Sequence, residues 1–326
     1  MRLRRSNVQG RGFRRARAGR GFTYTDPRGA RVTDQATRAR IEELAIPPAW
    51  QDVWISPHEN GHIQATGVDA AGRTQYLYHA AWRAKRDRVK FDRALELAAT
   101  LPAARRGVTR DLSAPEPTAA RALAVAFRLL DTAYLRIGSE RYASRHGSRG
   151  LATLLVRHVA VDGDVVELEF PGKSGVLWSA RLEDARLARV VEEMRDRPAR
   201  QRFLAWSERG SWTPLTPVEI NDDVRARTGE EFSSKDFRTL HGTVIAARAL
   251  ADAGPARTRR QRQERVVEAV RHTAATLGNT PAVARASYID PRVVDRYQAG
   301  EVIVVPSGGS AEAALRRLVL GDDAES

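Results

Sequence analysis

The sequence predicts an α+β protein: a small β-rich N-terminal domain, then a larger, mainly α-helical domain with one small antiparallel sheet. Short strand-like segments separated by Pro, Gly and Asn occupy residues 22–91. Beyond them, apolar residues recur at helical spacing and helix caps follow one another. The dipeptide Asp162-Gly163, between alternating apolar segments, marks a hairpin of the small sheet.

The composition indicates a folded, basic protein whose leading partner class is nucleic acid. With 326 residues, 42% of them hydrophobic, the chain is long enough for two domains with their own cores. It carries 54 Lys and Arg against 40 Asp and Glu, a net charge of +14. Such a field concentrates polyanions. A basic protein without this role is the alternative, because a GC-rich genome also enriches Arg and Ala.

Several classes of chemistry are excluded or disfavoured by what the sequence lacks. It has no cysteine, so disulfides, thiolate zinc sites and Cys nucleophiles are excluded. Walker-type loops, dinucleotide-binding Gly patterns and His-Glu-x-x-His motifs are not found, so we expect no cofactor and no metal. No apolar run approaches the roughly 20 residues of a membrane span, and no secretory signal is recognisable. We therefore expect a cytoplasmic protein without a membrane partner.

Residues 1–20 are predicted to form a flexible, Arg-rich arm. The segment holds eight Arg but only four apolar side chains larger than Ala, too few to bury. Its Arg4, Arg5, Arg14 and Arg15 are expected to hold nucleic-acid phosphates without reading sequence. An organellar transit peptide is the alternative, disfavoured by the single Ser and the weak amphipathic spacing.

The β-rich domain is predicted to span residues 21–92. Its strands are expected at 22–25, 53–56, 63–67 and 75–79, each bounded by turn-forming residues. A helix is expected over 80–101, followed by Pro102 and a hinge within 107–117.

Residues 93–326 are predicted to form the mainly helical domain. One helix should end near Arg136, with Gly138 as its C-cap. The small sheet is expected from 151–161, 166–170 and 176–182. Capping signals at Thr216-Pro217, at Ser233 or Ser234, and at Thr280-Pro281 predict three further helices, the last a short one holding Tyr288.

Taken singly, the residues that could carry chemistry also have structural explanations. Arg136 at a helix end would favour the helix dipole, and Lys173 on a Gly-flanked turn would simply be solvated. Lys235 and Arg238 could form a solvated helix face, although cations in a first helical turn oppose the macrodipole and hint at an external anion. Tyr288 alone would be a core aromatic.

Together, these segments resemble the poxvirus-like bacterial type IB DNA topoisomerases, which share their catalytic superfamily with tyrosine recombinases. The similar segments are Ile46-Pro47-Pro48-Ala49-Trp50, Val53-Trp54-Ile55-Ser56-Pro57, Gly61-His62-Ile63-Gln64-Ala65-Thr66-Gly67, Gln75-Tyr76-Leu77-Tyr78-His79, Tyr134-Leu135-Arg136-Ile137-Gly138, Gly172-Lys173-Ser174-Gly175, Lys235-Asp236-Phe237-Arg238-Thr239-Leu240-His241-Gly242-Thr243 and Ser287-Tyr288-Ile289-Asp290-Pro291. They occur in chain order between about residues 22 and 320. Separate motifs at sensible spacing are more specific than any one of them.

The resemblance implies a role for each matching residue. Tyr288 is the expected nucleophile, Arg136 and Arg238 stabilise the transition state, and Lys173 is the general acid. Lys235 assists, as a second proton donor or a minor-groove contact.

One position departs from the family pattern. The family usually has a His nine residues before the Tyr, where this chain has Asn279. An amide can donate a hydrogen bond to a nonbridging phosphate oxygen, but it cannot act as a cation or an acid. The resemblance also places DNA contacts at Gln75, Tyr76 and Tyr78; packing of both tyrosines on one sheet face is the alternative.

The implied enzyme is an isomerase that acts by DNA strand transesterification. It relaxes positive and negative supercoils of double-stranded DNA through transient single-strand cleavage, a 3′-phosphotyrosine and religation, without ATP or metal. By analogy with the family we expect a monomer that closes around duplex DNA in the bacterial nucleoid.

Two other functions are weighed against it. A tyrosine recombinase shares the chemistry but usually has His-x-x-Arg where this chain has Lys235-x-x-Arg238, and it lacks the β-rich N-terminal signature. A nonenzymatic DNA-binding protein would treat Tyr288 as structural and Asn279 as the mark of a decayed site. It would bind DNA with strong salt dependence and form no covalent adduct.

Overall fold

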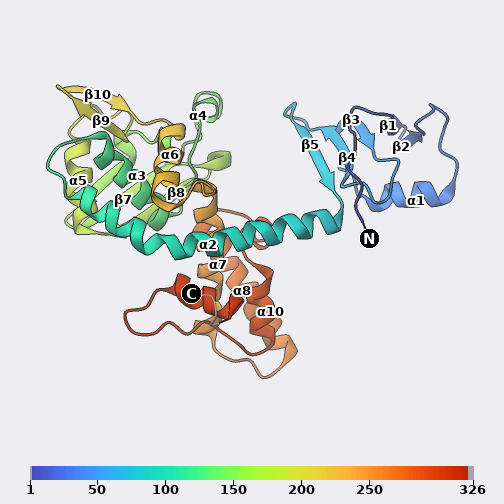
Figure 1. Cartoon of the computed structure of the whole chain (residues 1–326). Coiled ribbons are helices and arrows are strands. Elements are labelled where there is room, and N and C mark those ends of the chain that lie inside the picture. Colours follow the sequence, from blue (N-terminus) through green and yellow to red (C-terminus); the bar gives the residue numbers. More distant parts are fainter. Residues whose placement is uncertain (1, 322–326) are drawn as a thin grey trace. The chain divides into compact units, whose positions relative to one another are not determined.

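The computed structural model describes residues 2–321 and forms two compact units (Figure 1). The chain passes from the first unit to the second between Val89 and Lys90, close to the predicted boundary at residue 92. Met1 of the predicted arm and residues 322–326 of the predicted second domain lie outside the described residues. The first unit is built on a sheet and the second is mostly helical, so the α+β prediction is confirmed.

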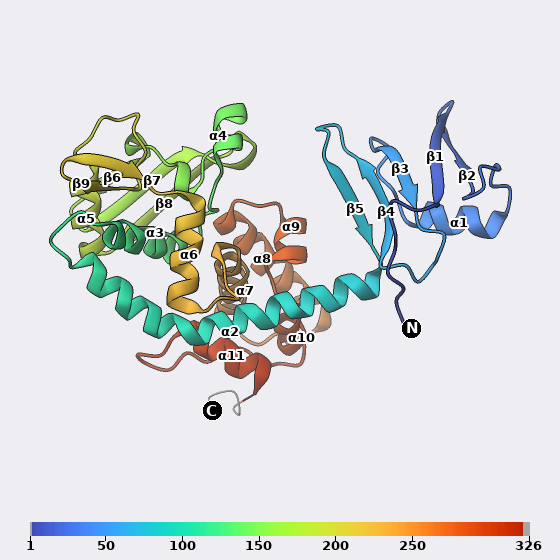
Figure 2. The ribbon, with the colours of Figure 1, turned by 45° about the horizontal axis from the view of Figure 1, so that its top comes forward.

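The first unit is a five-stranded antiparallel sheet in the order β2-β1-β3-β4-β5. One short helix, α1 (Gln35–Glu43), lies beside the sheet (Figure 2). Its Ile41 packs with Val53, Ile55 and Ala65 of the sheet. The strands are β1 (Phe13–Ala18), β2 (Gly21–Thr25), β3 (Gln51–Ile55), β4 (Ile63–Val68) and β5 (Thr74–Tyr78). All four predicted strands are present within a few residues of the expected bounds.

The prediction of a flexible arm over residues 1–20 is wrong for much of that segment. Strand β1 pairs with both β2 and β3 in the interior of the sheet. Ahead of it, the Arg4 amide and carbonyl bond the backbone of the 60–62 turn, and Ser6 bonds His62 and Ile63. Arg15 explains how so basic a strand can be ordered, because its guanidinium donates to three backbone carbonyls and stacks on a phenylalanine ring.

Helix α2 (Ala80–Leu112) overruns the predicted hinge. It continues through Pro102, which removes one N–H and normally breaks a helix interior. Leu95, Leu101, Val108 and Leu112 are buried on both sides of this proline. Packing in the core therefore outweighs the local cost, and residues 107–112 are helical.

Helix α3 (Ala119–Ala133) ends earlier than predicted. Its C-cap is Tyr134, in the left-handed conformation with φ 55°, and Arg136 follows in an irregular segment. Gly138 also has a positive φ, but it lies beyond the helix. The expected strand over 151–161 begins only at residue 159, because Leu151–Thr153 and Val156–His158 form 3₁₀ turns.

The predicted small sheet is confirmed as β6 (Val159–Asp162), β7 (Val165–Pro171) and β8 (Leu177–Glu183), all antiparallel. A second, two-stranded sheet, β9 (Ala205–Glu208) with β10 (Ser211–Pro214), was not anticipated. Neither were the helices α4 (Glu140–His146) and α5 (Ala185–Arg195).

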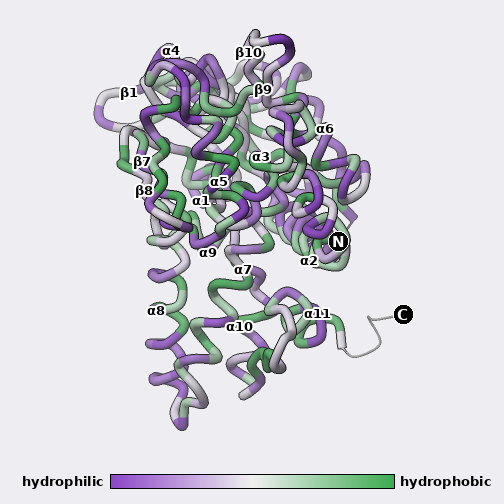
Figure 3. The backbone as a smooth tube through the Cα atoms, turned by 90° about the vertical axis from the view of Figure 1, so that its left-hand side faces the viewer, coloured by the Kyte–Doolittle hydropathy of each residue, from purple (hydrophilic) through white to green (hydrophobic). Residues whose placement is uncertain are grey.

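The remaining helices begin at the predicted caps. Thr216 and Ser233 cap α6 and α7, and Thr280 precedes the short helix α9. Along α8, hydrophobic and hydrophilic residues alternate as expected for a helix with one face in the core (Figure 3). The helices are α6 (Pro217–Thr228), α7 (Ser234–Ala253), α8 (Arg259–Leu277), α9 (Pro281–Ser287), α10 (Pro291–Gln298) and α11 (Ala311–Leu320). Within the described chain, none of the helices is both long and apolar enough to cross a membrane.

Arg15 and Arg14 make a matched pair for testing the order of β1. Arg15→Ala should lower the local free energy of opening of β1 by about 1–3 kcal/mol, because three carbonyls lose their donor. Arg14→Ala, at an exposed position of the same strand, should change it by less than about 0.5 kcal/mol. Native-state hydrogen exchange at the β1–β3 amides measures both. Equal, small effects would show that Arg15 does not hold the strand.

Candidate active site

Arg238 is the most deeply buried of the predicted site residues, at 3% exposure, and two helix ends hold it. Its Nη1 donates to the carbonyl oxygen of Tyr134, where α3 ends. Its Nη2 donates at 2.7 Å to the carbonyl oxygen of Leu277, the last residue of α8. Carbonyls at a helix C-terminus carry the negative end of the helix dipole. The two helix ends therefore stabilise a guanidinium that burial alone would disfavour.

A guanidinium has five N–H groups, and this arrangement leaves one buried donor of Arg238, its Nε, without an acceptor among the described residues. The Cζ atom of Arg238 lies 5.1 Å from the ring centroid of Tyr288. Burial and the charge of Arg136 lower the pKa of Arg238 to about 10, so it remains a cation at neutral pH.

The backbone around Arg136 is fixed by a close approach of two glycines. The left-handed Tyr134 turns the chain out of α3, and Gly138 then packs directly on Gly150. A Cβ atom on Gly150 would lie 2.7 Å from the Cα of Gly138, which explains why both positions are glycine. The Leu151 amide donates to the Arg136 carbonyl at 2.8 Å.

Asn279 lies between the two arginines. Its Oδ1 accepts a hydrogen bond of 2.5 Å from Nη2 of Arg136. Its Nδ2 donates, at 3.3 Å, to the same Leu277 carbonyl that accepts from Arg238. The backbone reaches this position through Gly278, the left-handed C-cap of α8. Asn279 thus joins the groups that hold Arg136 and Arg238.

Tyr288 directly follows α9, and its amide donates to the Ala284 carbonyl at 2.9 Å. A Cβ atom at Gly242 would lie 2.7 Å from the Tyr288 carbonyl oxygen, so α7 approaches this backbone as closely as only glycine permits. The Thr243 Oγ1 lies 3.1 Å from the same carbonyl oxygen and accepts the Asp290 amide at 3.1 Å. These contacts fix the backbone of Tyr288 against the helix that carries Arg238.

The two predicted lysines are exposed. Lys173 begins a 3₁₀ turn, Lys173–Gly175, at the tip of the β7–β8 hairpin, closed by a 2.8 Å bond from the Gly172 amide to the Val176 carbonyl. Lys235 lies in the first turn of α7. Both can therefore meet a ligand that arrives from solvent.

The electrostatic surroundings favour ionisation of Tyr288. Burial raises the pKa of its phenol, but the positive charges of Arg238, Arg136 and Lys173 more than offset this, so its pKa lies below the ordinary value. The structure thus brings a phenol activated by cations together with two guanidinium groups. Such a site can attack a phosphate ester and stabilise the negative charge that develops on it.

In the first unit, three of the predicted DNA contacts lie on β5, and they are divided between the two faces of this strand. Tyr76 and Tyr78 stack on each other with centroids 6.0 Å apart, and Tyr76 is 43% exposed. They lie on the face opposite Leu77, which packs on the core. Gln75 donates to Asp69 at 2.8 Å. Arg4, Arg5 and Arg14 are exposed, whereas the guanidinium of Arg15 already serves backbone carbonyls.

Sequence reasoning missed Trp178 and the pair His241 and Asp131. A Cβ atom on Gly278 would lie 2.6 Å from the Trp178 ring, so this ring places β8 beside Asn279. His241 and Asp131 are buried together behind the arginines. No local pattern reveals either contact, because each joins elements far apart in the sequence.

Four arginines also lie close together in the second unit, a grouping that the sequence did not predict. Arg149, Arg157, Arg200 and Arg202 line a hollow of about 550 Å³ around Leu155. Arg149 and Arg202 both donate to the Thr153 carbonyl, and burial and its arginine neighbours lower the pKa of Arg149. The hollow thus adds positive potential to the second unit.

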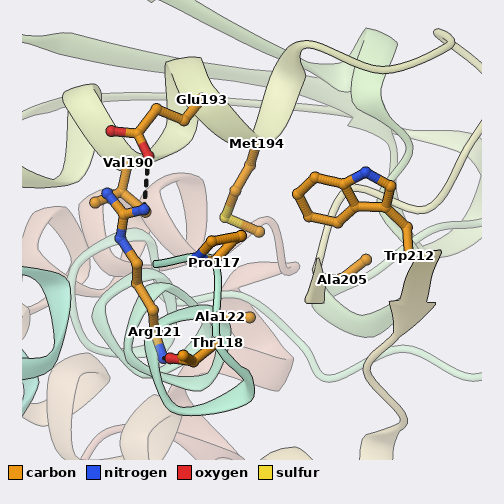
Figure 4. Close-up of a pocket in the computed structure, with 9 residues that line it drawn as sticks. All are labelled: Pro117, Thr118, Arg121, Ala122, Val190, Glu193, Met194, Ala205 and Trp212. Atoms are coloured by element: carbon orange, nitrogen blue, oxygen red, sulfur yellow. Dashed lines mark hydrogen bonds and ion pairs between the residues drawn. The ribbon is translucent and has the colours of Figure 1, made fainter. Parts of the chain in front are cut away.

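Another cavity, of about 120 Å³, is lined by residues outside the predicted site (Figure 4). Met194 and Trp212 form apolar walls between α5 and the β9–β10 hairpin, and none of the predicted site residues lines it. Arg121, 4% exposed, donates to Glu193 at 2.6 Å at its edge.

Comparisons with known proteins agree with this geometry. Residues 79–300 match the family model of the catalytic core of eukaryotic DNA topoisomerase I, and residues 21–69 match that of the N-terminal domain of bacterial DNA topoisomerase IB. The chain is also 28% identical over 277 residues to the DNA topoisomerase 1B of Acanthamoeba polyphaga mimivirus, a stretch that covers 79% of each chain. Because the catalytic-core model alone spans well over half of the sequence, the chain belongs to the type IB DNA topoisomerase family.

Proposed function

We propose that this type IB DNA topoisomerase relaxes supercoiled duplex DNA by attack of Tyr288 on a backbone phosphate, with Arg136 and Arg238 stabilising the transition state. The observation that carries the proposal is the position of the Tyr288 ring, 5.1 Å from Cζ of Arg238, where cations lower the phenol pKa. Cleavage forms a 3′-phosphotyrosine and releases a 5′-hydroxyl.

The nucleophile needs its positive surroundings. A phenol has an ordinary pKa near 10 and attacks poorly while neutral. The charges of Arg238, Arg136 and Lys173 stabilise the phenolate as the proton leaves. When Tyr288 attacks, this negative charge passes to the nonbridging oxygens of the pentacoordinate phosphorus, still beside the same cations.

The arginines suit the transition state better than lysines would. A planar guanidinium can bind two oxygens of a phosphate at once in a site with little water. After the two carbonyl bonds of Arg238, its Nε still has no acceptor among the described residues. Asn279, with Oδ1 taken by Arg136, has an amide N–H for a nonbridging oxygen, the role that the usual His would fill.

Lys173 is the proposed general acid. The leaving 5′-oxygen would depart as a strongly basic alkoxide unless a proton reaches it. Lys173 stands on an exposed hairpin tip, and its charge reaches the Tyr288 phenol. Lys235, exposed at the start of α7, is the proposed assisting residue, either as a second donor or as a minor-groove contact.

The covalent intermediate explains how strands pass without an energy source. The phosphotyrosine ester conserves the energy of the broken phosphodiester, so religation needs neither ATP nor metal. While one strand is open, the duplex beyond the nick can rotate about the intact strand. Supercoils of either sign are thereby relaxed.

The first unit is proposed to hold the duplex. Tyr76 and Tyr78 present a stacked pair outside the core face, and Gln75 is the candidate for major-groove reading. The exposed Arg4, Arg5 and Arg14 are proposed to contact phosphates; Arg15 is not, since its donors are occupied. We expect a monomer, working on the nucleoid in the bacterial cytoplasm.

The mechanism predicts relaxation of negatively supercoiled plasmid in EDTA without ATP, and a covalent adduct trapped by SDS on the 3′ side of the nick. Tyr288→Phe should remove both, because it lacks the attacking oxygen, while DNA binding persists. The control is Tyr142→Phe, at an exposed tyrosine of α4. DNA binding by the wild type without relaxation or adduct would reject the proposed function.

The phenol pKa can be measured directly in the free enzyme. Lys173→Ala should raise the pKa of Tyr288, because one of the cations that lower it is gone. Lys173→Arg keeps the charge and should leave the pKa near the wild-type value. NMR titration with ¹³C-labelled tyrosine measures the pKa, and loss of the signal in Tyr288→Phe assigns it. A pKa unchanged in Lys173→Ala would place Lys173 too far away to act.

The role of Lys173 as acid can be isolated with a sulfur leaving group. On normal DNA, Lys173→Ala should slow cleavage about 10²- to 10⁴-fold. On an oligonucleotide with a 5′-bridging phosphorothiolate, the variant should cleave almost as fast as wild type, since a thiolate leaves without protonation. Arg238→Ala should not be rescued, because its defect lies at the nonbridging oxygens. Equal loss on both substrates would contradict the assignment.

A further inference from the structure

A chain of polar and charged groups, centred on the buried residues His241 and Asp131, lies close to the proposed catalytic arginines. The His241 Nε2 and Asp131 Oδ1 atoms are 3.0 Å apart, and both residues are 4% exposed. Arg105 binds the same carboxylate with two bonds of 2.7 and 2.9 Å, and it also binds Glu312 at 2.6 Å. The chain thus ties together four helices, α2, α3, α7 and α11.

Asp131 is the ionised centre of this chain. Burial raises the pKa of its carboxyl group, but hydrogen bonds from His241 and Arg105 hold the pKa well below its ordinary range. Because an ionised carboxylate only accepts hydrogen bonds, Nε2 of His241 must carry the hydrogen and donate it. The direction of this bond is therefore determined, and a side chain without a donor at this point would leave Asp131 short of one bond.

Two of the helices so joined are α3, which leads into the segment with Arg136, and α7, which carries Arg238. Asp131 lies in the last turn of α3, just before the segment with Arg136. His241 lies three residues after Arg238, on the same side of α7. A shift of α3 against α7 would therefore change the spacing of the two guanidinium groups.

Tyr134 makes the connection more direct. Its ring lies against the His241 ring, with centroids 4.9 Å apart, while its carbonyl oxygen accepts from Nη1 of Arg238. Its left-handed backbone also begins the turn toward Arg136. One residue thus contacts the buried pair and both arginine-bearing segments.

We propose that the buried His241–Asp131 pair is a positioning device that sets the relative placement of Arg136 and Arg238, and so acts on cleavage through the arginines. This inference rests on the proposed roles of the two arginines. Because both side chains are 4% exposed, the pair is proposed to act through the arginines and not on the DNA itself. Arg105 binds both Asp131 and Glu312, and so links the pair to α2 and α11.

The test compares His241→Phe, which fills the volume without a donor, with His241→Gln, which keeps an N–H near the position of Nε2. Adduct formation is followed on plasmid DNA with excess enzyme, and DNA affinity is measured separately. His241→Phe should slow cleavage about 10- to 100-fold with nearly unchanged DNA affinity, since a displacement of about 1 Å has this effect. His241→Gln should stay within about 3-fold of wild type.

Combination with Arg238→Ala separates positioning from a general loss of structure. If His241 acts through Arg238, adding His241→Phe to Arg238→Ala should slow cleavage by less than about 3-fold more, because coupled sites are not additive. Full additivity, or wild-type cleavage by His241→Phe, would overturn the inference. Leu187→Ala, at a fully buried position of α5, controls for lost stability at matched thermal unfolding. An equal cleavage defect in that control would also overturn it.

A replacement variant and an independent test of the proposed function complete the experiment. Should His241→Phe fail to fold, His241→Asn takes its place, since its amide is too short to reach Asp131. The proposed function is tested independently by the wild type and by Arg238→Ala alone. If the wild type forms the adduct and Arg238→Ala is defective, wild-type cleavage by His241→Phe would contradict the positioning role and leave the proposed function standing.

Discussion

The burial of Arg238 between the ends of α3 and α8 is the constraint on which the rest of the site depends. An arginine at 3% exposure must have its donors satisfied and its charge offset, and here two helix-terminal carbonyls do both. Those carbonyls are available only because Tyr134 and Gly278 end their helices in the left-handed conformation. The same two terminations lead the chain into Arg136 and Asn279, so the geometry that holds one arginine also delivers its partners.

Backbone dipoles, and not a carboxylate, accept the hydrogen bonds of Arg238 among the described residues. A carboxylate hydrogen-bonded to this guanidinium would compete with the phosphate and would hold a negative charge beside a phenol that must ionise. Carbonyl groups stabilise the cation in part and leave a net positive field, which lowers the pKa of Tyr288. Under the proposed mechanism, the extra negative charge of the transition state neutralises this field best. Substrate binding and rate enhancement would then draw on the same unbalanced charge.

The sequence predicted those features that depend on local patterns. Caps at Thr216 and Thr280 and the turn at Asp162-Gly163 locate elements because their signals lie within a few residues. Prediction failed where distant contacts decide the outcome: Arg15 makes a basic strand stable through carbonyls about thirty residues away, and core packing carries α2 through Pro102. The roles proposed for Tyr288 and Arg238 came from a family resemblance. Their spacing, by contrast, is visible only in three dimensions, because Gly242 and Leu277 create it.

Asn279 shows how a departure from the family pattern fits these physical constraints. The position lies between two guanidinium groups, one bound by its Oδ1 and the other sharing the Leu277 carbonyl with its Nδ2. A protonated imidazole there would add a third cation and could not accept the hydrogen bond from Arg136. A neutral amide accepts that bond and still has an N–H to donate, so it holds Arg136 without further repulsion. The amide thereby helps to place Arg136, and the positive charge stays on the arginines and on Lys173.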